Sequence, residues 1–266
     1  MKSKFQFIEL YQKSIITSTK NKMKKIYLAF AMLLTMAACT QNKPSQQAES
    51  NKTEVGDNKL VDCDITLNGI HFTKSINGGD KLVTDSSGII TVRANPNADF
   101  FIDPNEKISQ DDAGILLTEV DNTKPFTFKG KVTSGFLKEG GLYNAATFFV
   151  FANDTLWQKL CFEQGDHGEH RIVSVRTIGT SDDNNHDVVD SAKSVYFKIS
   201  SDTHTIASYF SLDGQEWQMV RIYRNNYPQK LYLGICSQAP QAEECVSTFE
   251  ELSLTTDNVD DFRMGN

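Results

Sequence analysis

From about residue 60 to residue 255 the sequence repeats one pattern. Short runs rich in β-branched and aromatic residues are each ended by Gly, Asn, Asp or Pro. Within many runs apolar and polar residues alternate, which is the two-residue period of a strand with one buried face. No stretch of ordinary helix length shows the period of an amphipathic helix. About thirteen short strands in roughly 200 residues favour an all-β fold, either a two-sheet sandwich or a barrel.

Turn chemistry sets the boundaries of these strands. Asn77-Gly78-Gly79 and Asp213-Gly214, for example, are residue types that end strands and form tight turns. The strands predicted in this way are residues 65–73, 89–94, 99–102, 115–119, 126–133, 145–152, 155–163, 171–178, 194–200, 205–211, 216–223, 231–237 and 245–254.

The N-terminal region has the features of a secretory signal. Two lysines precede the apolar run 26–38, and small residues lead into Cys39. A basic segment, a short apolar stretch and a small-residue cleavage site describe such a signal, and the run is too short for a permanent membrane helix. We therefore expect residues 1–38 to be a signal peptide, with Met23 as the true start.

The residues around Cys39 resemble the lipobox of bacterial lipoproteins, in which the cysteine becomes the lipidated first residue of the mature protein. Residues 39–58 contain almost nothing apolar, so we expect a lipid anchor followed by a flexible tether. These features predict a lipid-anchored protein of the bacterial cell envelope, on the outer-membrane or periplasmic side. An ordinary signal followed by an unrelated cysteine is the alternative.

The charge of the chain excludes some partners. Removal of residues 1–38, which hold seven lysines and one acidic residue, changes the formal charge from -7 to -13. Such an acidic chain is a poor partner for nucleic acid and for anionic lipid surfaces. We expect no nucleic-acid partner, and membrane contact through the anchor only. Neutral glycans or cations fit this charge better.

Four further cysteines follow the anchor: Cys63, Cys161, Cys236 and Cys245. An oxidising envelope permits a disulfide, and Cys236 with Cys245 is the favoured pair because the two flank a predicted hairpin loop. Free, buried thiols are the alternative. The spacing contains no CxxC motif, which argues against zinc and thioredoxin-like chemistry.

The segment from Trp157 to Glu163 gives the best candidate for a ligand-binding row. Alternation places Trp157, Lys159 and Glu163 on one face of a strand and the more apolar Leu160 and Phe162 on the other. The apolar face should point into the core between the sheets. The other face would then carry an aromatic ring, an ammonium group and a carboxylate in a row.

The next predicted strand, residues 171–178, is expected to extend this row. Val173 and Val175 should point into the core, which leaves Ser174 and Arg176 on the open face beside the previous strand. A few polar groups among aromatic rings are typical of a ligand groove. A solvated sheet face in which charged residues only form ion pairs is the alternative.

The run Ser181–Asp187 places many oxygen donors in a predicted loop. Calcium requires six to eight oxygen ligands, but the run does not match the EF-hand pattern. Asp182 and Asp183 are therefore weak calcium candidates, and a solvated turn is the favoured interpretation. We expect no cofactor.

Five stretches in the second part of the chain carry motifs that occur in a fixed order: residues 93–104, 157–163, 172–183, 209–217 and 234–240. Together they resemble an uncharacterised bacterial family related to the fungal regulator-of-enolase protein. The resemblance covers about residues 70–255 and implies the concanavalin A-like lectin/glucanase jelly roll, a two-sheet sandwich. That superfamily includes lectins, glucanases and carbohydrate-binding modules, so it implies a glycan ligand by analogy. Gln238 joins the candidate site because it matches a family motif near the end of its strand.

These observations predict a jelly-roll domain over residues 59–256 and a loose tail over residues 257–266. We expect the domain to bind carbohydrate on its concave sheet face without cleaving it. One alternative is a glycoside hydrolase or lyase, for which Glu163 is the only acid that can be placed in the groove. Another is a structural or protein-interaction module of the envelope. The predicted ligand-binding residues are Trp157, Lys159, Glu163, Ser174, Arg176 and Gln238.

Overall fold

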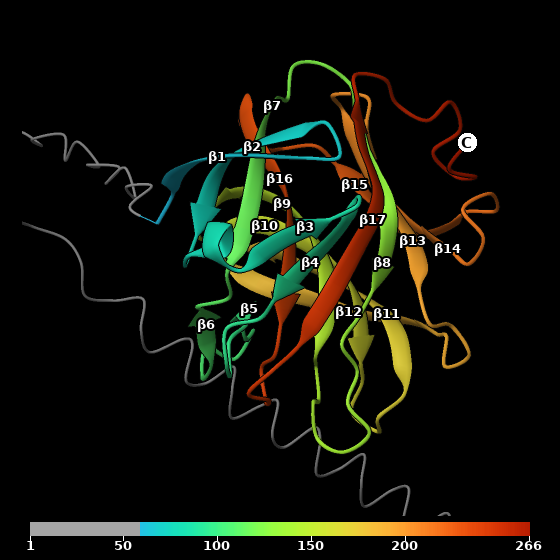
Figure 1. The fold of residues 1–266 in the computed structure, drawn as a ribbon. Helices are drawn as coiled ribbons and strands as arrows, with labels where there is room; N and C mark the ends of the chain where they lie inside the picture. Colours follow the sequence, from blue (N-terminus) through green and yellow to red (C-terminus); the bar gives the residue numbers. More distant parts are fainter. Residues whose placement is uncertain (1–58) are drawn as a thin grey trace, which may run out of the picture. The chain divides into compact units, whose positions relative to one another are not determined.

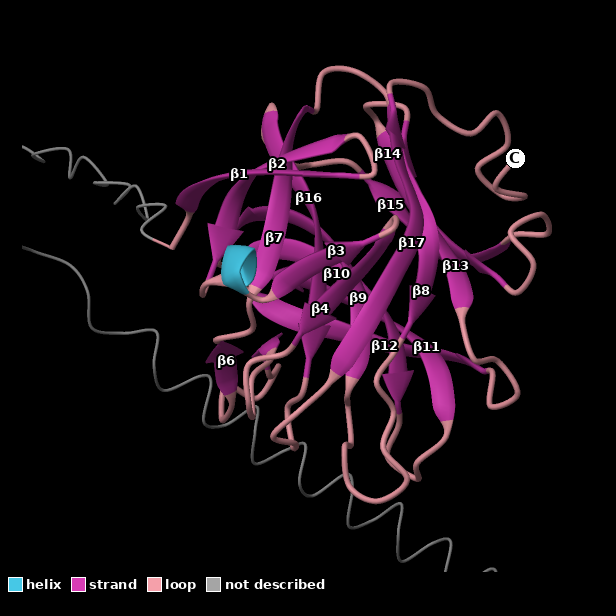
Figure 2. Cartoon of the chain, viewed as in Figure 1, coloured by secondary structure: helices cyan, strands magenta, loops and turns pink. Residues whose placement is uncertain are grey.

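In the computed structural model, which describes residues 59–266, antiparallel strands form two large sheets and one small hairpin. Figure 2 shows strands throughout this region, and the short 3-10 turn η1 (Gly79–Lys81) is the only helical segment among the described residues. No helix in this part of the chain is long and apolar enough to cross a membrane. The predicted all-β, two-sheet sandwich is confirmed. The predicted signal peptide, Cys39 anchor and tether lie outside the described residues.

The larger sheet contains eight strands, and each is antiparallel to its neighbours. Four strands that are consecutive in sequence occupy one end of it, because short hairpins join them. In spatial order the strands are β1 (Val61–Leu67), β2 (Ile70–Ile76), β7 (Ile115–Asp121), β16 (Lys230–Gln238), β9 (Ala145–Asn153), β10 (Leu156–Gln164), β11 (His170–Ile178) and β12 (Thr180–Val188).

The smaller sheet contains seven strands and lies against one face of the larger sheet. A separate two-stranded hairpin lies outside both sheets (Figure 1). The order of the smaller sheet is β15 (Gln218–Arg224), β14 (Thr205–Ser211), β13 (Val195–Ser201), β8 (Phe126–Thr133), β17 (Val246–Thr255), β4 (Ile89–Arg93) and β3 (Val83–Ser86), and the hairpin consists of β5 (Phe100–Ile102) and β6 (Ser109–Asp111).

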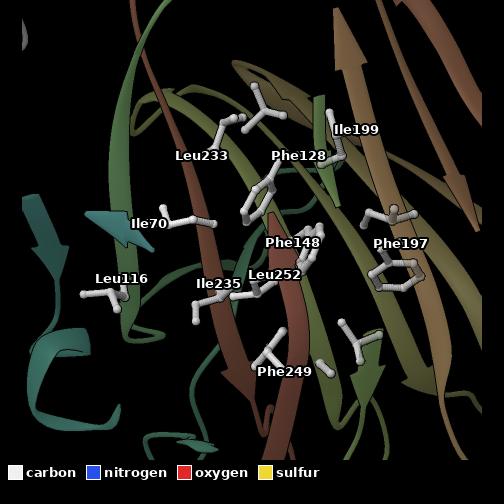
Figure 3. Packing of buried hydrophobic residues seen from close by; sticks show 14 of the residues in the cluster. Ile70, Leu116, Phe128, Phe148, Phe197, Ile199, Leu233, Ile235, Phe249 and Leu252 are labelled. Carbon is white, nitrogen blue, oxygen red and sulfur yellow. The ribbon is translucent and has the colours of Figure 1, made fainter. Parts of the chain in front are cut away.

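Large apolar side chains from both sheets form the main core. Figure 3 shows Phe148 of β9 beside Phe128 of β8 and Phe197 of β13, with ring centroids 4.5 and 5.7 Å from that of Phe148. Leu160 and Phe162 of β10 belong to the same buried cluster, as alternation predicts. Burial of each such side chain stabilises the fold by about 1.5–3 kcal/mol.

A second buried cluster lies on the outer face of the larger sheet, which is the face turned away from the smaller sheet. Phe100, at the start of β5, packs edge-on against Phe149, Phe151 and Trp157, at centroid distances of 5.6 to 6.3 Å. Trp157 is fully buried there. The prediction of Trp157 as an accessible ring is therefore wrong. Alternation correctly places Trp157 on the outer face of the larger sheet, but the β5–β6 hairpin covers that part of the face.

The side chains of β11 face the opposite way from the prediction. Val173 lies opposite Cys161 of β10, and Val175 lies opposite Lys159. Residues directly opposite in an antiparallel pair share a face, so both valines lie on the outer face. Their burial beneath neighbouring side chains of that face accounts for their apolar character.

Ser174 and Arg176 therefore point toward the smaller sheet, and the prediction that they lie beside Glu163 is wrong. Arg221 of β15 donates from Nε to Ser174 Oγ at 2.8 Å. The guanidinium of Arg176 lies 4.0 Å from the ring centroid of Tyr223. The hydroxyl of Ser174 thus has a partner on β15, whereas Arg176 stacks on Tyr223 and its buried Nε has no hydrogen-bond partner among the described residues.

The C-terminal segment, residues 257–266, is docked rather than loose. The Tyr209 hydroxyl donates to the carbonyl of Phe262 at 2.8 Å, and Lys198 Nζ donates to the carbonyl of Gly265 at 2.7 Å. In Figure 1 this red segment lies beside the smaller sheet. It covers aromatic and apolar side chains on the outer face of β14 and β15, which explains why the chain end is ordered.

All four cysteines in the described region are free. Cys236 points into the outer-face cluster, whereas the thiol of Cys245 lies near the hydroxyls of Ser134 and Ser247. The favoured Cys236–Cys245 disulfide is therefore wrong. The alternative of free, buried thiols describes Cys161, Cys236 and Cys245, while Cys63 is only partly buried.

Candidate functional site

A cleft of about 440 Å³ opens on the outer face of the larger sheet beside the β5–β6 hairpin. Glu163 of β10 and two valines of β11 line it from the sheet. Side chains of β12, of the hairpin and of the loops before β9 and after β16 complete its walls. Its volume falls within the range of about 300–1,000 Å³ that is usual for ligand pockets.

Lys159 fixes the inner end of this cleft. It is 2% exposed and donates from Nζ to Asp99 Oδ1 at 2.7 Å and to Gln238 Oε1 at 3.1 Å. Burial has the largest single effect and lowers the pKa of Lys159, but the negative charge of Asp99, the neighbouring acidic groups and the hydrogen bond to Asp99 together outweigh it and raise the pKa. The ammonium group therefore stays charged, and its charge is used to hold two chain segments together.

Gln238 connects Lys159 to the loop before β9, because its Nε2 donates a hydrogen bond to the carbonyl of Tyr143 at 3.3 Å. Tyr143 has a φ of 66°, which a residue with a bulky side chain rarely adopts. Its hydroxyl donates to Asp166, and this hydrogen bond together with burial raises the pKa of Tyr143 to about 12. Backbone conformations of this kind concentrate at functional sites.

Glu163 is the buried acid of the cleft. Its side chain lines the cleft, yet the residue is only 7% exposed, and its carboxyl makes no hydrogen bond to any described residue. Desolvation raises the pKa of Glu163 to about 8, against the opposing effect of the Lys159 charge. Near neutral pH this carboxyl is therefore mostly protonated, and it can both donate and accept a hydrogen bond.

The residues predicted as a calcium loop form the edge strand β12 instead. Alternation separates the two candidates, because Asp183 and Asn185 line the cleft while Asp182 lies 3.4 Å from Arg221. Partial burial raises the pKa of Asp183. Within residues 59–266, no group of three His, Cys, Asp or Glu side chains could hold a metal ion.

Part of the cleft lining is apolar. It includes Phe101 and Ile108 of the β5–β6 hairpin and Pro240, which follows β16. Phe101 is half-buried and Ile108 is 51% exposed, so both present apolar surface to solvent. The amide of Ile102 donates to Ser181 Oγ at 3.0 Å, which fixes the hairpin against β12. Phe101 thus provides the accessible aromatic ring that was predicted at Trp157.

Of the predicted ligand-binding residues, the structure brings together Lys159, Glu163 and Gln238, with Lys159 beneath the cleft surface. Trp157 is buried under the hairpin, and Ser174 and Arg176 lie on the other face of the sheet. The cleft residues missed from the sequence include Asp99 and Phe101. Both belong to the stretch 93–104, which the family resemblance had already singled out. The sequence did not predict, however, that this stretch packs over β10.

The fold is similar to those of several solved structures. A functionally unknown protein from Saccharomyces cerevisiae aligns with a TM-score of 0.62 at 23% identity, over 70% of this chain and 96% of that chain. The Bacteroides ovatus protein Xyloglucan PUL GH43B gives a TM-score of 0.55 at 10% identity, and xylan beta-1,4-xylosidase from Bacillus Halodurans C-125 gives 0.53 at 11%. This chain matches 41% of the length of each of these two proteins.

At these identities the likeness shows a shared jelly-roll-type fold and nothing about activity. No curated protein sequence matches the chain significantly. A family model described as "Protein of unknown function (DUF1349)" matches residues 76–257, which is more than half of the chain. The chain therefore belongs to the DUF1349 family, whose function is unknown.

Proposed function

We propose that the cleft binds carbohydrate and does not cleave it. The observation that carries the proposal is the mixed lining of the cleft, which combines exposed apolar side chains with carboxyl and amide groups. Phe101, Ile108 and Pro240 can cover the apolar face of a sugar ring. Glu163 and Asn185 line the same cleft and offer donors and acceptors to the sugar hydroxyl groups. Two structures of similar fold carry the words xyloglucan and xylan in their names, which supports the proposal by analogy.

A glycoside hydrolase is the second candidate, because the protonated Glu163 has the character of a general acid. Hydrolysis usually needs a second carboxyl group across the scissile bond. In the strand register Asp183 is level with Lys159, four residues along β10 from Glu163 and two strands across. Asp99 is held by Lys159, and Asp166 accepts from Tyr143. This arrangement favours binding over hydrolysis.

The position in the cell is part of the same proposal and rests on the sequence. A lipid at Cys39 would tether the domain within the bacterial envelope, where it meets extracellular or periplasmic glycans. The relation to the fungal regulator-of-enolase protein likewise rests on the sequence stretches alone. A role as a protein-interaction module would use the same cleft for a partner side chain.

A glycan array followed by calorimetry on the purified protein tests the proposal. We expect a set of related oligosaccharides to bind, and Phe101→Ala to weaken that binding by about tenfold, which is about 1.4 kcal/mol. Leu212→Ala is the matched control, since Leu212 is an apolar residue 56% exposed outside the cleft. Binding of no glycan, or equal binding by Phe101→Ala, contradicts the proposal. Release of reducing sugar from a bound oligosaccharide favours the hydrolase instead.

A further inference from the structure

Resting on the proposed function, we infer that the cleft selects neutral sugars against uronic and sulfated sugars, that the charge of Asp183 contributes to this selectivity, and that Glu163 hydrogen-bonds the neutral ligand. The cleft presents carboxyl groups to an incoming ligand, and no lysine, arginine or histidine is among its described lining residues. The carboxyl of Glu163 lines the cleft and makes no hydrogen bond to a described residue, so it is free to bind a ligand hydroxyl.

The ionisable groups that line the cleft are acids. They are Asp99, Glu163, Asp166 and Asp183, and none of the described lining residues is Lys, Arg or His. Asp99 is paired with Lys159 and Glu163 is mostly protonated near neutral pH, so the repulsion of an anionic ligand comes from Asp166 and Asp183. An anionic sugar would enter among like charges in a partly desolvated cleft, where repulsion is stronger than in bulk water. A neutral sugar meets hydrogen-bond acceptors there without this penalty.

The nearest cations are already paired. Lys159 is buried and donates to Asp99. Arg171 lies directly opposite Glu163 in the strand register, and its Nη2 is 3.1 Å from Glu169 Oε1. Recognition of carboxylate or sulfate generally uses an arginine or lysine with free donors. Neither residue lines the cleft, although Arg171 Nε has no hydrogen-bond partner among the described residues.

Glu163 has two states that differ in what they can bind. In its acid form the carboxyl donates one hydrogen bond and accepts others, as a sugar hydroxyl requires of its partner. In its ionised form it only accepts, and it adds a negative charge to the cleft. Because burial raises the pKa of Glu163 to about 8, the acid form dominates at neutral pH and is lost above pH 8.

The neighbouring groups Lys159 and Tyr143 do not change their protonation state between pH 7 and pH 9.5, so a change in binding over this range can be assigned to Glu163. Lys159 stays protonated because of Asp99, and the pKa of Tyr143 is about 12. Binding of a neutral sugar should therefore weaken as pH rises from 7 to 9.5, as Glu163 ionises. The charged or titratable groups around Glu163 are Lys159 and Cys161 on β10, Arg171 on β11, Asp183 on β12, Asp99 before β5, Tyr143 before β9 and Asp166 in the β10–β11 turn.

The experiment measures affinity by calorimetry for cellopentaose, laminaripentaose and mannopentaose, each beside its C6-oxidised uronic acid form. For a neutral probe that binds, we expect at least tenfold weaker binding of the oxidised form at pH 6.5. The affinity of the wild type for the neutral probe should fall by about tenfold between pH 7 and pH 9.5. In Glu163→Gln this fall should disappear, so that at pH 9.5 the variant binds the neutral probe more tightly than the wild type.

Asp183→Asn tests the charge argument separately, because Asp183 lies on an exposed edge strand where substitution leaves the core intact. The measured quantity is the affinity for the neutral probe divided by the affinity for its oxidised form. We expect Asp183→Asn to lower this ratio at least threefold, while Glu139→Gln, an exposed control outside the cleft, leaves it unchanged.

Equal or tighter binding of an oxidised probe overturns this inference and leaves the proposed function standing. If no probe of either kind binds, and the array is also negative, the proposed function fails and the inference with it. A pH dependence that persists in Glu163→Gln removes Glu163 from the explanation.

Discussion

Replacement of Glu163 by glutamine should remove a pH dependence from the stability of the whole fold. The folded protein holds a proton on this carboxyl up to pH about 8, because burial disfavours the charged form, whereas the pKa of a free glutamate is 4.5. Between these values the folded chain binds one more proton than the unfolded chain. Stability from the acid form is therefore fully present below pH 4.5 and is lost as pH rises through 8.

The size of the effect follows from the difference between the two pKa values. A shift of one pKa unit corresponds to about 1.4 kcal/mol, so the change from 4.5 to about 8 corresponds to about 5 kcal/mol in total. Between pH 5 and pH 7 the wild type should lose about 2.7 kcal/mol relative to Glu163→Gln. That is a substantial part of the 5–15 kcal/mol that is usual for the free energy of unfolding.

Urea denaturation of both proteins at pH 5, 6 and 7, with equal m-values as a check on two-state behaviour, measures this difference. Other titrating groups are common to both proteins, so they cancel in the comparison. The exposed control Glu139→Gln should stay within about 0.5 kcal/mol of the wild type at every pH. A difference between wild type and Glu163→Gln that stays constant from pH 5 to pH 7 would refute the buried, protonated state of Glu163.

Three further outcomes are expected from denaturation experiments. Lys159→Met should cost about 3–5 kcal/mol, because it leaves Asp99 without its buried partner. Phe100→Ala should cost about 3–5 kcal/mol, whereas Phe101→Ala next to it should cost much less, since only Phe100 is fully enclosed. Desolvation and the nearby Lys129 lower the pKa of Lys198 from 10.5 to about 8, so the wild type should gain stability relative to Lys198→Met as pH rises from 8 to 10.5.

The two-sheet sandwich could be predicted because its cause is local. A strand period and the turn residues around it are properties of a few neighbouring residues, and the strands β9, β10 and β11 with the hairpins between them follow from these properties. The direction of β11 could not be predicted in the same way. Its valines and the apolar residues of β10 lie on both faces of a sheet that is covered on both sides. Alternation identifies two faces but does not say which of two covered faces meets the second sheet.

Strand β12 illustrates a different limit. Its sequence, Thr180–Val188, is rich in Asp and Asn, which have low intrinsic preference for strands. The strand forms because β11 offers it an unpaired edge, and its polar side chains suit an edge position that must not recruit another chain. Pairing with β11 therefore determined the conformation of this segment, rather than its own sequence. In the resulting strand, Asp183 lines the cleft and Asp182 lies on the opposite face.

The cleft itself depends on contacts between parts of the chain that are distant in sequence. Lys159 and Asp99 are 60 residues apart, and Lys159 and Gln238 are 79 residues apart, yet one ammonium group joins all three. Because Lys159 is already paired with Asp99, it is not available to the other acids that line the cleft or to a bound ligand. The arrangement that makes the fold stable at this point is therefore also the reason that an anionic ligand finds no free positive charge there.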